Sequence, residues 1–338
     1  MRKNRIGKTD IEATHLSFGG IKLHPNMPDK AENIVSKALD LGINYIDTAR
    51  CYGQSEVLIG AVMKERRSQC YLSSKSIRRK KSETAEDIDT SLRNLNTDMI
   101  DIYFCHDISR DNNYDIIMSE SGSLAAIKEA QKAGKIRYTA ISTHRADIAI
   151  KAINTGEFDV IMLPINLFDQ EFITDVVPVA LKEKVGIVGM KPLAGGAFKH
   201  PQIALRYSLA QDVEAQLVGI SSIAELEEDF QIADSFKPLS ESEMEELKEE
   251  SMELGKDFCR QCGYCLPCTV EIDIPKVFLY ERYAKRFWLD DFAKEQYAML
   301  EMKGDECVEC GKCEDRCPYE LPIIEKMAAA HESLAGKV

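Results

Sequence analysis

Eight short apolar runs, each followed by a longer amphipathic stretch, fill the first two thirds of this 338-residue chain. The runs lie at 15–18, 43–46, 70–73, 99–105, 136–141, 160–165, 185–190 and 216–218. Their β-branched and aromatic residues favour strands, and the stretches between them, such as 29–41 and 82–95, have the apolar period of helices. Eight strand-then-helix units in about 220 residues predict an α/β fold, the closed (β/α)8 TIM barrel, rather than an open sheet. The preceding segment 4–14 predicts a small hairpin at the bottom of the barrel.

A polar or charged residue stands just past most of the predicted strands. These residues are Asp47, Lys75, His106, Ser142, Asn166, Lys191 and Ser221. In a (β/α)8 barrel the active site lies at the C-terminal ends of the strands, so the sequence predicts that these side chains meet on one polar rim. Each of them alone also fits the ordinary preference of loops for polar residues.

Four residues near this rim form a chemical set: Asp47, Tyr52, Lys75 and His106. A free phenol has a pKa of about 10, too high for easy proton donation at neutral pH. The ammonium of Lys75 would lower the pKa of Tyr52, and Asp47 would hold that ammonium in place. Tyr52 could then act as a general acid toward a carbonyl oxygen that a neutral His106 orients. None of the four can supply electrons, so a bound hydride donor is implied.

Neither G-x-G-x-x-G nor G-x-x-x-x-G-K-[ST] occurs in the chain, so a Rossmann dinucleotide site and a P-loop have no support. A nicotinamide cofactor would instead lie across the mouth of the barrel. Gly195 and Gly196 after the seventh run, and the loop 219–222 that leads into a predicted helix, suit a pyrophosphate.

Around these residues the chain resembles the aldo-keto reductase family, from Arg5 to Ala233. The resemblance rests on Asp47-Thr48-Ala49, Tyr52-Gly53, Ser55-Glu56, Lys75, His106, Gly134 to Arg137, Ser142, Lys191-Pro192-Leu193 and Gly195-Gly196. It implies NAD(P)H-dependent reduction of an aldehyde or ketone. The implied catalytic tetrad is Asp47, Tyr52, Lys75 and His106. The implied cofactor-binding residues are Ser142, Thr143, Asn166, Lys191, Leu193, Gly195, Gly219, Ser221, Glu228 and Asp229.

Three departures from the family pattern bear on the cofactor. Thr143 follows Ser142 where the family usually has asparagine, and Met190-Lys191 replaces the aromatic residue that commonly stacks on the nicotinamide. The segment 219–229 contains no Lys or Arg, with which many relatives bind the 2′-phosphate of NADP. Its acidic residues are Glu225, Glu227, Glu228 and Asp229. A carboxylate near the ribose would repel a 2′-phosphate and accept from a 2′-hydroxyl, so we expect NADH to be preferred over NADPH.

Eight of the eleven cysteines form two groups in the last third of the chain. The first group, C-x2-C-x2-C-x2-C, runs from Cys259 to Cys268, and the second, C-x2-C-x2-C-x3-C-P, from Cys307 to Pro318. Without a secretory leader, clustered thiols indicate metal ligands rather than disulfides. The second pattern is that of bacterial two-cluster ferredoxins, in which the fourth cysteine binds the other cluster.

This crossing rule predicts two [4Fe–4S] clusters. One would be held by Cys259, Cys262, Cys265 and Cys317, and the other by Cys268, Cys307, Cys310 and Cys313. The first group departs from the ferredoxin pattern, because its last spacer is two residues and Thr269 follows Cys268 where proline is usual. Structural zinc, held in sites of four cysteines, is the alternative, although two sets of four regularly spaced cysteines favour iron.

The expected organisation is a barrel over residues 1–235, an acidic helical linker over 236–256, and a small α-helical ferredoxin-like iron–sulfur domain over 257–338. A subfamily of aldo-keto reductases carries such a C-terminal domain, and the chain resembles it over its whole length. The net charge of −13 argues against a nucleic-acid partner. No run of 18 apolar residues occurs, as a membrane helix would need, and the lack of a signal-peptide pattern favours a cytoplasmic location.

Two functions fit these features. The first is an oxidoreductase that acts on a small-molecule carbonyl substrate and uses its clusters for electron transfer. The second is a ferredoxin-type electron-transfer protein, with a ferredoxin or another redox protein as partner and the barrel as a docking or cofactor platform. A hydride carries two electrons whereas each cluster carries one, and no recognisable flavin site supplies the conversion. A non-catalytic scaffold is disfavoured because the tetrad is complete.

Overall fold

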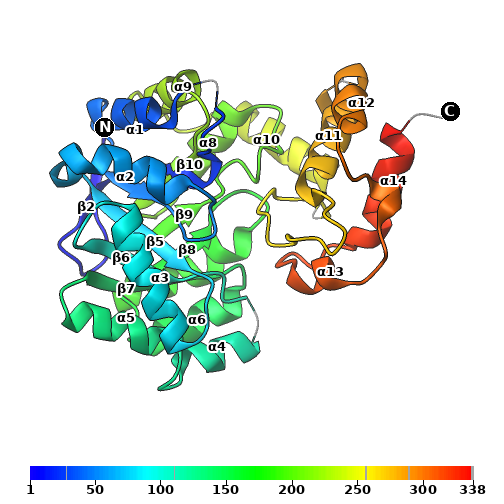
Figure 1. The fold of residues 1–338 in the computed structure, drawn as a ribbon. Helices are drawn as coiled ribbons and strands as arrows, with labels where there is room; N and C mark the ends of the chain where they lie inside the picture. Colours follow the sequence, from blue (N-terminus) through cyan, green and yellow to red (C-terminus); the bar gives the residue numbers. More distant parts are fainter. Residues whose placement is uncertain (28, 110, 256, 288–289, 336–338) are drawn as a thin grey trace. The chain divides into compact units, whose positions relative to one another are not determined.

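A computed structural model describes residues 1–27, 29–109, 111–255, 257–287 and 290–335 (Figure 1). The chain divides into two compact units. The first consists of Met1–Leu193 and His200–Leu247, and the second of Ala194–Lys199 and Lys248–Val338. Within the domain expected at 257–338, residues 288–289 and 336–338 lie outside the described residues.

The first unit is built on a closed barrel of eight parallel strands. They are β3 (Leu16–Gly19), β4 (Tyr45–Asp47), β5 (Tyr71–Ser76), β6 (Ile100–Cys105), β7 (Ile136–Ser142), β8 (Val160–Pro164), β9 (Gly186–Met190) and β10 (Ala215–Gly219). Each strand pairs with the next along the chain, and β10 pairs with β3 to close the barrel. The predicted (β/α)8 TIM barrel and all eight of its strands are confirmed.

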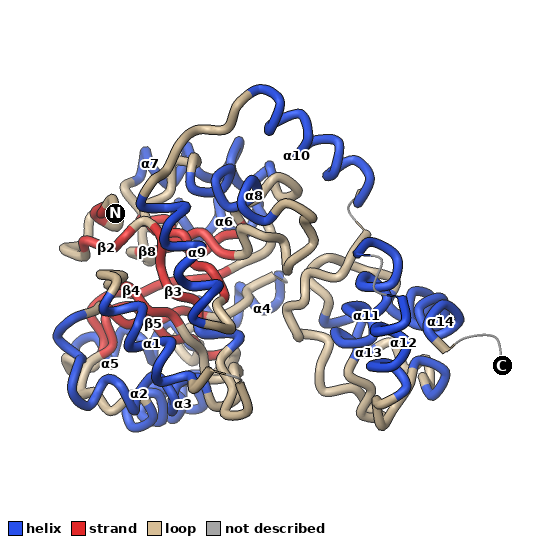
Figure 2. Tube along the Cα trace, turned by 90° about the horizontal axis from the view of Figure 1, so that it is seen from above, coloured by secondary structure: helices blue, strands red, loops and turns tan. Residues whose placement is uncertain are grey.

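Helices surround the barrel, as the helical and strand colours of Figure 2 show. They are α1 (Ala31–Asp40), α2 (Ser55–Arg66), α3 (Lys81–Asn94), α4 (Asp111–Met118), α5 (Ser123–Lys132), α6 (Ala146–Asn154), α7 (Val177–Glu183), α8 (Pro201–Leu209) and α9 (Ile223–Asp234). Because successive strand residues point to opposite faces, the strands supply two apolar layers. Residues such as Ile46 and Ile141 pack against the helices, whereas Phe104 and Val188 belong to a separate cluster inside the barrel.

A hairpin of β1 (Lys3–Arg5) and β2 (Glu12–Thr14) closes the bottom of the barrel, as predicted. Ile6 and Ile11 of the hairpin are fully buried in the cluster inside the barrel. Gly7 has φ +49°, and a Cβ there would lie 2.4 Å from the backbone nitrogen of Gly186. Only glycine therefore allows the turn to approach the start of β9 so closely.

The second unit is helical in the part of the chain that the structure describes. Its elements are the second half of α10 (Glu241–Leu254), α11 (Ile274–Phe287), α12 (Asp290–Ala298), α13 (Lys312–Arg316) and α14 (Ile323–Leu334). Its core includes Val277 of α11, Tyr297 of α12 and Met327 of α14. None of the helices in the described part of the chain combines the length and the apolar character that crossing a lipid bilayer requires.

Candidate functional site

Three of the four tetrad residues lie at the C-terminal ends of neighbouring strands. Asp47 ends β4, Lys75 is the penultimate residue of β5, and His106 directly follows β6. All three are buried. Tyr52 lies half-buried in the loop between β4 and α2. The parallel register of β4, β5 and β6 thus brings together residues that are far apart in the sequence.

The buried pair of Asp47 and Lys75 is the centre of this set. The Lys75 Nζ donates to Asp47 Oδ2 at 2.5 Å and to the carbonyl oxygen of Thr48 at 2.7 Å. The other carboxylate oxygen of Asp47 accepts from the Ser73 hydroxyl at 2.6 Å, and Ser73 in turn accepts from Tyr45 at 2.9 Å. Burial raises the pKa of Asp47, although Lys75 and Ser73 act to lower it. The ammonium is therefore held at a fixed point below the rim.

Tyr52 and His106 lie against this ammonium. The Lys75 Nζ is 4.8 Å from the centre of the Tyr52 ring. The ring centres of Tyr52 and His106 are 5.8 Å apart, in an edge-to-face arrangement of 83°. Burial and the charge of Lys75 lower the pKa of His106 well below its usual value, so that its imidazole is neutral at pH 7. The structure thus brings all four predicted tetrad residues together.

Backbone hydrogen bonds to β5 fix the loop that carries Tyr52. The amides of Thr48 and Arg50 donate to the carbonyls of Ser73 and Lys75, each at 3.0 Å. Behind the loop, the buried Glu56 accepts from the side chains of Arg50, Ser74 and Asn94. Glu56 thus holds this loop in position. The Ser55-Glu56 motif alone does not indicate that role.

Cys51, next to Tyr52, also reaches the tetrad. Its Sγ lies 3.5 Å from the Nδ1 of His106. The residue as a whole is exposed, yet burial around the sulfur raises the pKa of the thiol to about 11. Cys51 is therefore a neutral thiol at pH 7 that contacts the side of His106.

A second polar chain on the rim joins Asp107, His144 and Lys191. The His144 Nδ1 lies 3.1 Å from Asp107 Oδ1, and its Nε2 lies 3.0 Å from the Nζ of Lys191. Burial and the charge of Lys191 lower the pKa of His144. Burial tends to raise the pKa of Asp107, but hydrogen bonds from His144 and Ser109 hold it below its ordinary value. The sequence signal for His144 was weak, because it stands two residues beyond the end of β7.

Most of the predicted nicotinamide-binding residues lie on the same rim and make hydrogen bonds within it. The Ser142 hydroxyl accepts from the Asp107 amide at 2.9 Å, and the Thr143 hydroxyl donates to the Ile108 carbonyl at 2.8 Å. The Asn166 side chain donates to Asp169 Oδ2 at 2.8 Å and to the Lys191 carbonyl at 3.1 Å. The structure therefore groups Ser142, Thr143, Asn166 and Lys191. Leu193 is half-buried beside the outer apolar layer.

Gly195 belongs to the second unit. It has φ +74°, and a Cβ on it would lie 2.4 Å from the carbonyl oxygen of Arg260. The close approach of the Arg260 backbone is thus a sufficient reason for glycine at this position. The sequence alone gave no sign of this contact.

The loop after β10 is predicted to hold a pyrophosphate. Several of its hydrogen-bond donors bind carboxylates. The amide and the hydroxyl of Ser221 donate to Glu225 Oε2 at 2.8 and 2.7 Å, and the Ile223 amide donates to Asp29 Oδ2 at 2.8 Å. Ser222 caps α9. The donors of this loop, which begins at Gly219, thus already bind carboxylates, which are anions of the kind that a helix N-terminus attracts. The amide and hydroxyl of Ser221 could bind a cofactor phosphate only if Glu225 released them.

The helix that follows this loop carries the acidic residues predicted near the ribose. Burial and the neighbouring Glu225 and Glu228 raise the pKa of Asp229 to about 7. Glu228 accepts from the Gln202 side chain at 2.7 Å. The loop and the start of α9 are thus acidic, although Lys22 lies 3.8 Å from Glu225.

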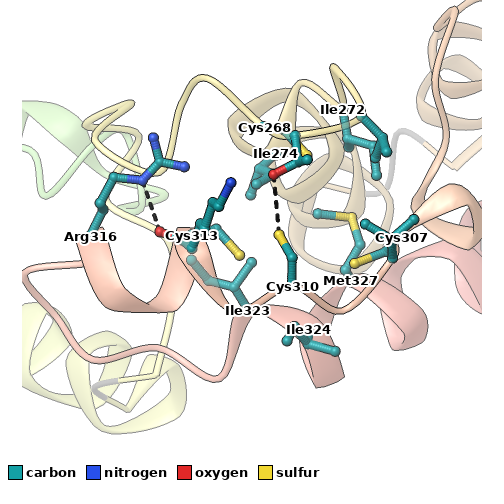
Figure 3. A pocket seen from close by; sticks show the side chains of 14 residues that line it. Cys268, Ile272, Ile274, Cys307, Cys310, Cys313, Arg316, Ile323, Ile324 and Met327 are labelled. Carbon is teal, nitrogen blue, oxygen red and sulfur yellow. Dashed lines mark hydrogen bonds between the residues drawn. The ribbon is translucent and has the colours of Figure 1, made fainter.

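In the second unit the eight cysteines gather in two sets. Cys259 and Cys265 both interact with Cys262 and Cys317, and burial raises the pKa of Cys259 to about 11. The other four, Cys268, Cys307, Cys310 and Cys313, line one pocket of about 390 Å³, part of it open to solvent (Figure 3). Two sets of converging thiols, with apolar side chains around them, fit two iron–sulfur clusters. These are the sets that the crossing rule predicts.

Among the described residues, which include all eleven cysteines, no three His, Cys, Asp or Glu side chains lie close enough together to hold one metal ion. A structural zinc site requires four ligands at about 2.3 Å from one ion.

Comparison with known proteins gives two family matches. The model of the aldo/keto reductase family matches residues 15–202, and the model of the 4Fe-4S dicluster domain matches residues 258–322. The first match covers more than half of the chain and contains the whole tetrad. The second contains all eight clustered cysteines.

Individual proteins agree with the first match. The chain is 29% identical over 210 residues to the uncharacterized oxidoreductase YqkF of Bacillus subtilis, covering 58% of this chain and 66% of YqkF. It is 28% identical over 274 residues to L-galactose dehydrogenase of Arabidopsis thaliana, covering 66% and 85%. The holo structure of aldo-keto reductase AKR11C1 from Bacillus halodurans superposes with a TM-score of 0.65 at 26% identity, covering 74% of this chain and 96% of that one. The chain thus spans just under two thirds of YqkF.

Proposed function

The chain belongs to the aldo/keto reductase family, and on that premise we propose that it reduces the carbonyl group of an aldehyde or a ketone at the rim of its barrel. The observation that carries this proposal is the cluster of four side chains, of which Asp47, Lys75 and His106 are buried and Tyr52 is half-buried. In it, the Lys75 Nζ lies 2.5 Å from Asp47 and 4.8 Å from the centre of the Tyr52 ring. A proton donor, a cation that makes it more acidic and a neutral imidazole are the groups that carbonyl reduction requires.

Tyr52 is the proton donor in this proposal. The ammonium of Lys75 favours the phenolate and so makes the phenol a stronger acid. Asp47 and the Thr48 carbonyl keep the ammonium in place. His106, kept neutral by burial and by Lys75, donates a hydrogen bond to the carbonyl oxygen and orients it. When bound, NADH or NADPH supplies the hydride.

For the cofactor we propose NADH rather than NADPH. Ser142, Thr143, Asn166 and Lys191 would hold its nicotinamide end, and Gly219 and Ser221 its phosphates. Glu228 and Asp229 on α9 would accept from a ribose 2′-hydroxyl and repel a 2′-phosphate. Burial and, after it, the charges of Glu225 and Glu228 raise the pKa of Asp229 to about 7; this local negative charge would also act on a 2′-phosphate and supports the choice of NADH.

We further propose two [4Fe–4S] clusters, which supply one-electron transfer when bound. The first is assigned to Cys259, Cys262, Cys265 and Cys317. The second is assigned to Cys268, Cys307, Cys310 and Cys313. Thiolates kept for iron require a reducing compartment, so we propose a cytoplasmic location. The net charge of −13 argues against a nucleic-acid partner.

An electron-transfer role is the second candidate function. Cys310 of the second set is exposed, which would allow a redox protein such as a ferredoxin to approach that cluster. In this alternative the barrel serves as a docking or cofactor platform. Electron transfer to a viologen dye would then be independent of Tyr52.

Replacing Tyr52 with phenylalanine tests the carbonyl-reducing proposal. Tyr52→Phe removes only the acidic hydroxyl, so NADH-dependent turnover of a panel of aldehydes and ketones should fall by about 10²- to 10⁴-fold. Cofactor binding, measured by fluorescence, and iron content should not change. Tyr138→Phe is the matched control, because the Tyr138 hydroxyl bonds to Asp10 at the opposite end of the barrel. Undiminished carbonyl reduction by Tyr52→Phe would remove Tyr52 from the acid role.

A further inference from the structure

The two cysteine sets lie in different surroundings. The first set has two buried arginines beside it, Arg260 and Arg282, which are only 4% and 7% exposed. In the second set Cys310 is exposed, and its neighbour Val308 is 58% exposed. Iron–sulfur reduction potentials depend on local charge, on hydrogen bonds to sulfur and on exposure. Two clusters held in such different sites should not have the same potential.

Arg282 reaches the first set from α11. One guanidinium nitrogen donates to the Gly195 carbonyl at 2.9 Å, and another donates to the carbonyl of Cys259. Because it binds the carbonyl of Cys259, its positive charge lies close to the Cys259 sulfur. A buried cation at this distance is screened little by solvent.

Arg260 lies between the two segments that supply this set. Its guanidinium carbon is 3.7 Å from the centre of the Phe258 ring and 4.8 Å from that of Tyr319. Phe258 precedes Cys259, and Tyr319 follows Cys317 by two residues. The second buried cation is therefore also next to the first set rather than the second.

Hydrogen bonds to sulfur are present in both sets, so the difference between the sets lies in their cations. The backbone amide and the side-chain amide of Gln261 point to the Sγ of Cys259 at 3.4 and 3.5 Å. In the second set the Thr269 hydroxyl lies 3.2 Å from the Cys310 Sγ. The cations nearest to that set, Lys312 and Arg316, are not buried, so solvent weakens their effect.

Reduction adds one negative charge to a cluster, and burial alone would disfavour that charge. Buried cations oppose this effect, and their attraction is largest where the dielectric constant is low. We propose that Arg282 and Arg260 give the cluster of Cys259, Cys262, Cys265 and Cys317 the higher reduction potential of the two. A single electron added to the protein then resides on this first cluster. The second cluster, which includes the exposed Cys310, exchanges electrons with a redox partner protein. The inference rests on the cluster assignment proposed above.

The test is a redox titration of the anaerobic protein with both clusters, monitored by electron paramagnetic resonance. The wild type should show two midpoints. Arg282→Met should lower the higher one, changing the ratio of reduced to oxidised cluster at a fixed potential by about tenfold, or about 59 mV for one electron. Arg282→Lys, which keeps the charge, should keep most of the wild-type difference between the two midpoint potentials. Cys310→Ser should alter the spectrum of the other, lower-potential cluster and so assign the signals.

Lys285→Met is the matched control, because Lys285 lies on the same helix but is exposed and paired with Glu281. It should leave both midpoints unchanged. Iron analysis tests the cluster assignment separately, with about eight iron atoms expected per chain. If Arg282→Met loses iron, Arg260→Met and Gln261→Leu replace it and should also lower the higher midpoint. One common midpoint in the wild type, or unchanged midpoints in iron-replete variants, would overturn the proposal.

Discussion

At the scale of single residues, His106 and His144 sit where a charged imidazolium is costly. Burial and the charge of Lys75 depress the pKa of His106, and burial and the charge of Lys191 depress that of His144. Both imidazoles therefore stay neutral in the native state at pH values at which an unfolded histidine takes up a proton. This neutrality suits a hydrogen-bond donor at the carbonyl, and it makes folding sensitive to pH.

The pH dependence follows from the direction of these shifts. An unfolded histidine has a pKa of about 6.5, so below that pH the unfolded chain binds more protons than the native one, and stability falls as the pH falls. Each native-neutral histidine contributes up to about 1.4 kcal/mol per pH unit, down to its native pKa. The free energy of unfolding of the barrel, measured with urea at pH 7.5, 6.5 and 5.5, should fall less with falling pH in His106→Gln than in the wild type. The exposed His24→Gln is the control variant, and the same dependence of stability on pH in the wild type and in His106→Gln would contradict this account.

At the scale of elements, the start of α9 is the proposed site for the cofactor phosphates. Positive partial charge at the N-terminus of a helix attracts an anion, and here Glu225 of the helix itself takes that place by binding the amide and hydroxyl of Ser221. A cofactor phosphate must therefore displace a carboxylate. In this proposal the start of α9 forms the phosphate site, and Glu225 of the same helix weakens phosphate binding to it.

Glu225→Gln should relieve this competition. The neutral amide competes less well for the Ser221 donors, and a helix-terminal charge is worth about 0.3–2 kcal/mol, so NADH and NADPH should both bind about 2- to 30-fold more tightly. The ratio between them should move toward NADPH, whose extra phosphate is repelled most. Fluorescence titration measures both constants. Glu227→Gln is the control, since Glu227 lies on the same helix but pairs with Lys37 at 2.7 Å. Weaker binding to Glu225→Gln would mean that the carboxylate supports the cofactor site.

The barrel and the meeting of the tetrad could be predicted from the sequence because both follow from strand periodicity and parallel register. Features that depend on backbone outside that pattern could not. Asp107 and Lys191, with φ +52° and +56°, adopt left-handed conformations that place their side chains on His144. Gly195 fits a phosphate-binding pattern, but the nearby Arg260 backbone by itself leaves no room for a side chain at this position. Contacts between loops that are distant in the sequence produce no repeating pattern of apolar residues from which they could be predicted.

At the scale of the whole molecule, the two units depend on different sources of stability. The barrel unit has two extensive apolar layers. In the second unit the thiols are part of the core: Cys265 is buried among Ile272, Val277 and Leu321, and five other cysteines of the two sets pack against that core. A small domain that places metal ligands in its core gains folding free energy from the metal.

Loss of a cluster should therefore unfold the second unit and spare the barrel. Cys265→Ser removes a buried residue that we propose as a ligand of the first cluster, so the iron content should fall and the calorimetric transition of the second unit should broaden or disappear. The barrel transition should move by less than about 2–4 °C, the effect of 1 kcal/mol on a domain of this size. Cys51→Ser, at an exposed cysteine outside both sets, should keep the iron and both transitions. A second unit that melts as before without its iron would show that its apolar core is sufficient, and the clusters would then serve electron transfer alone.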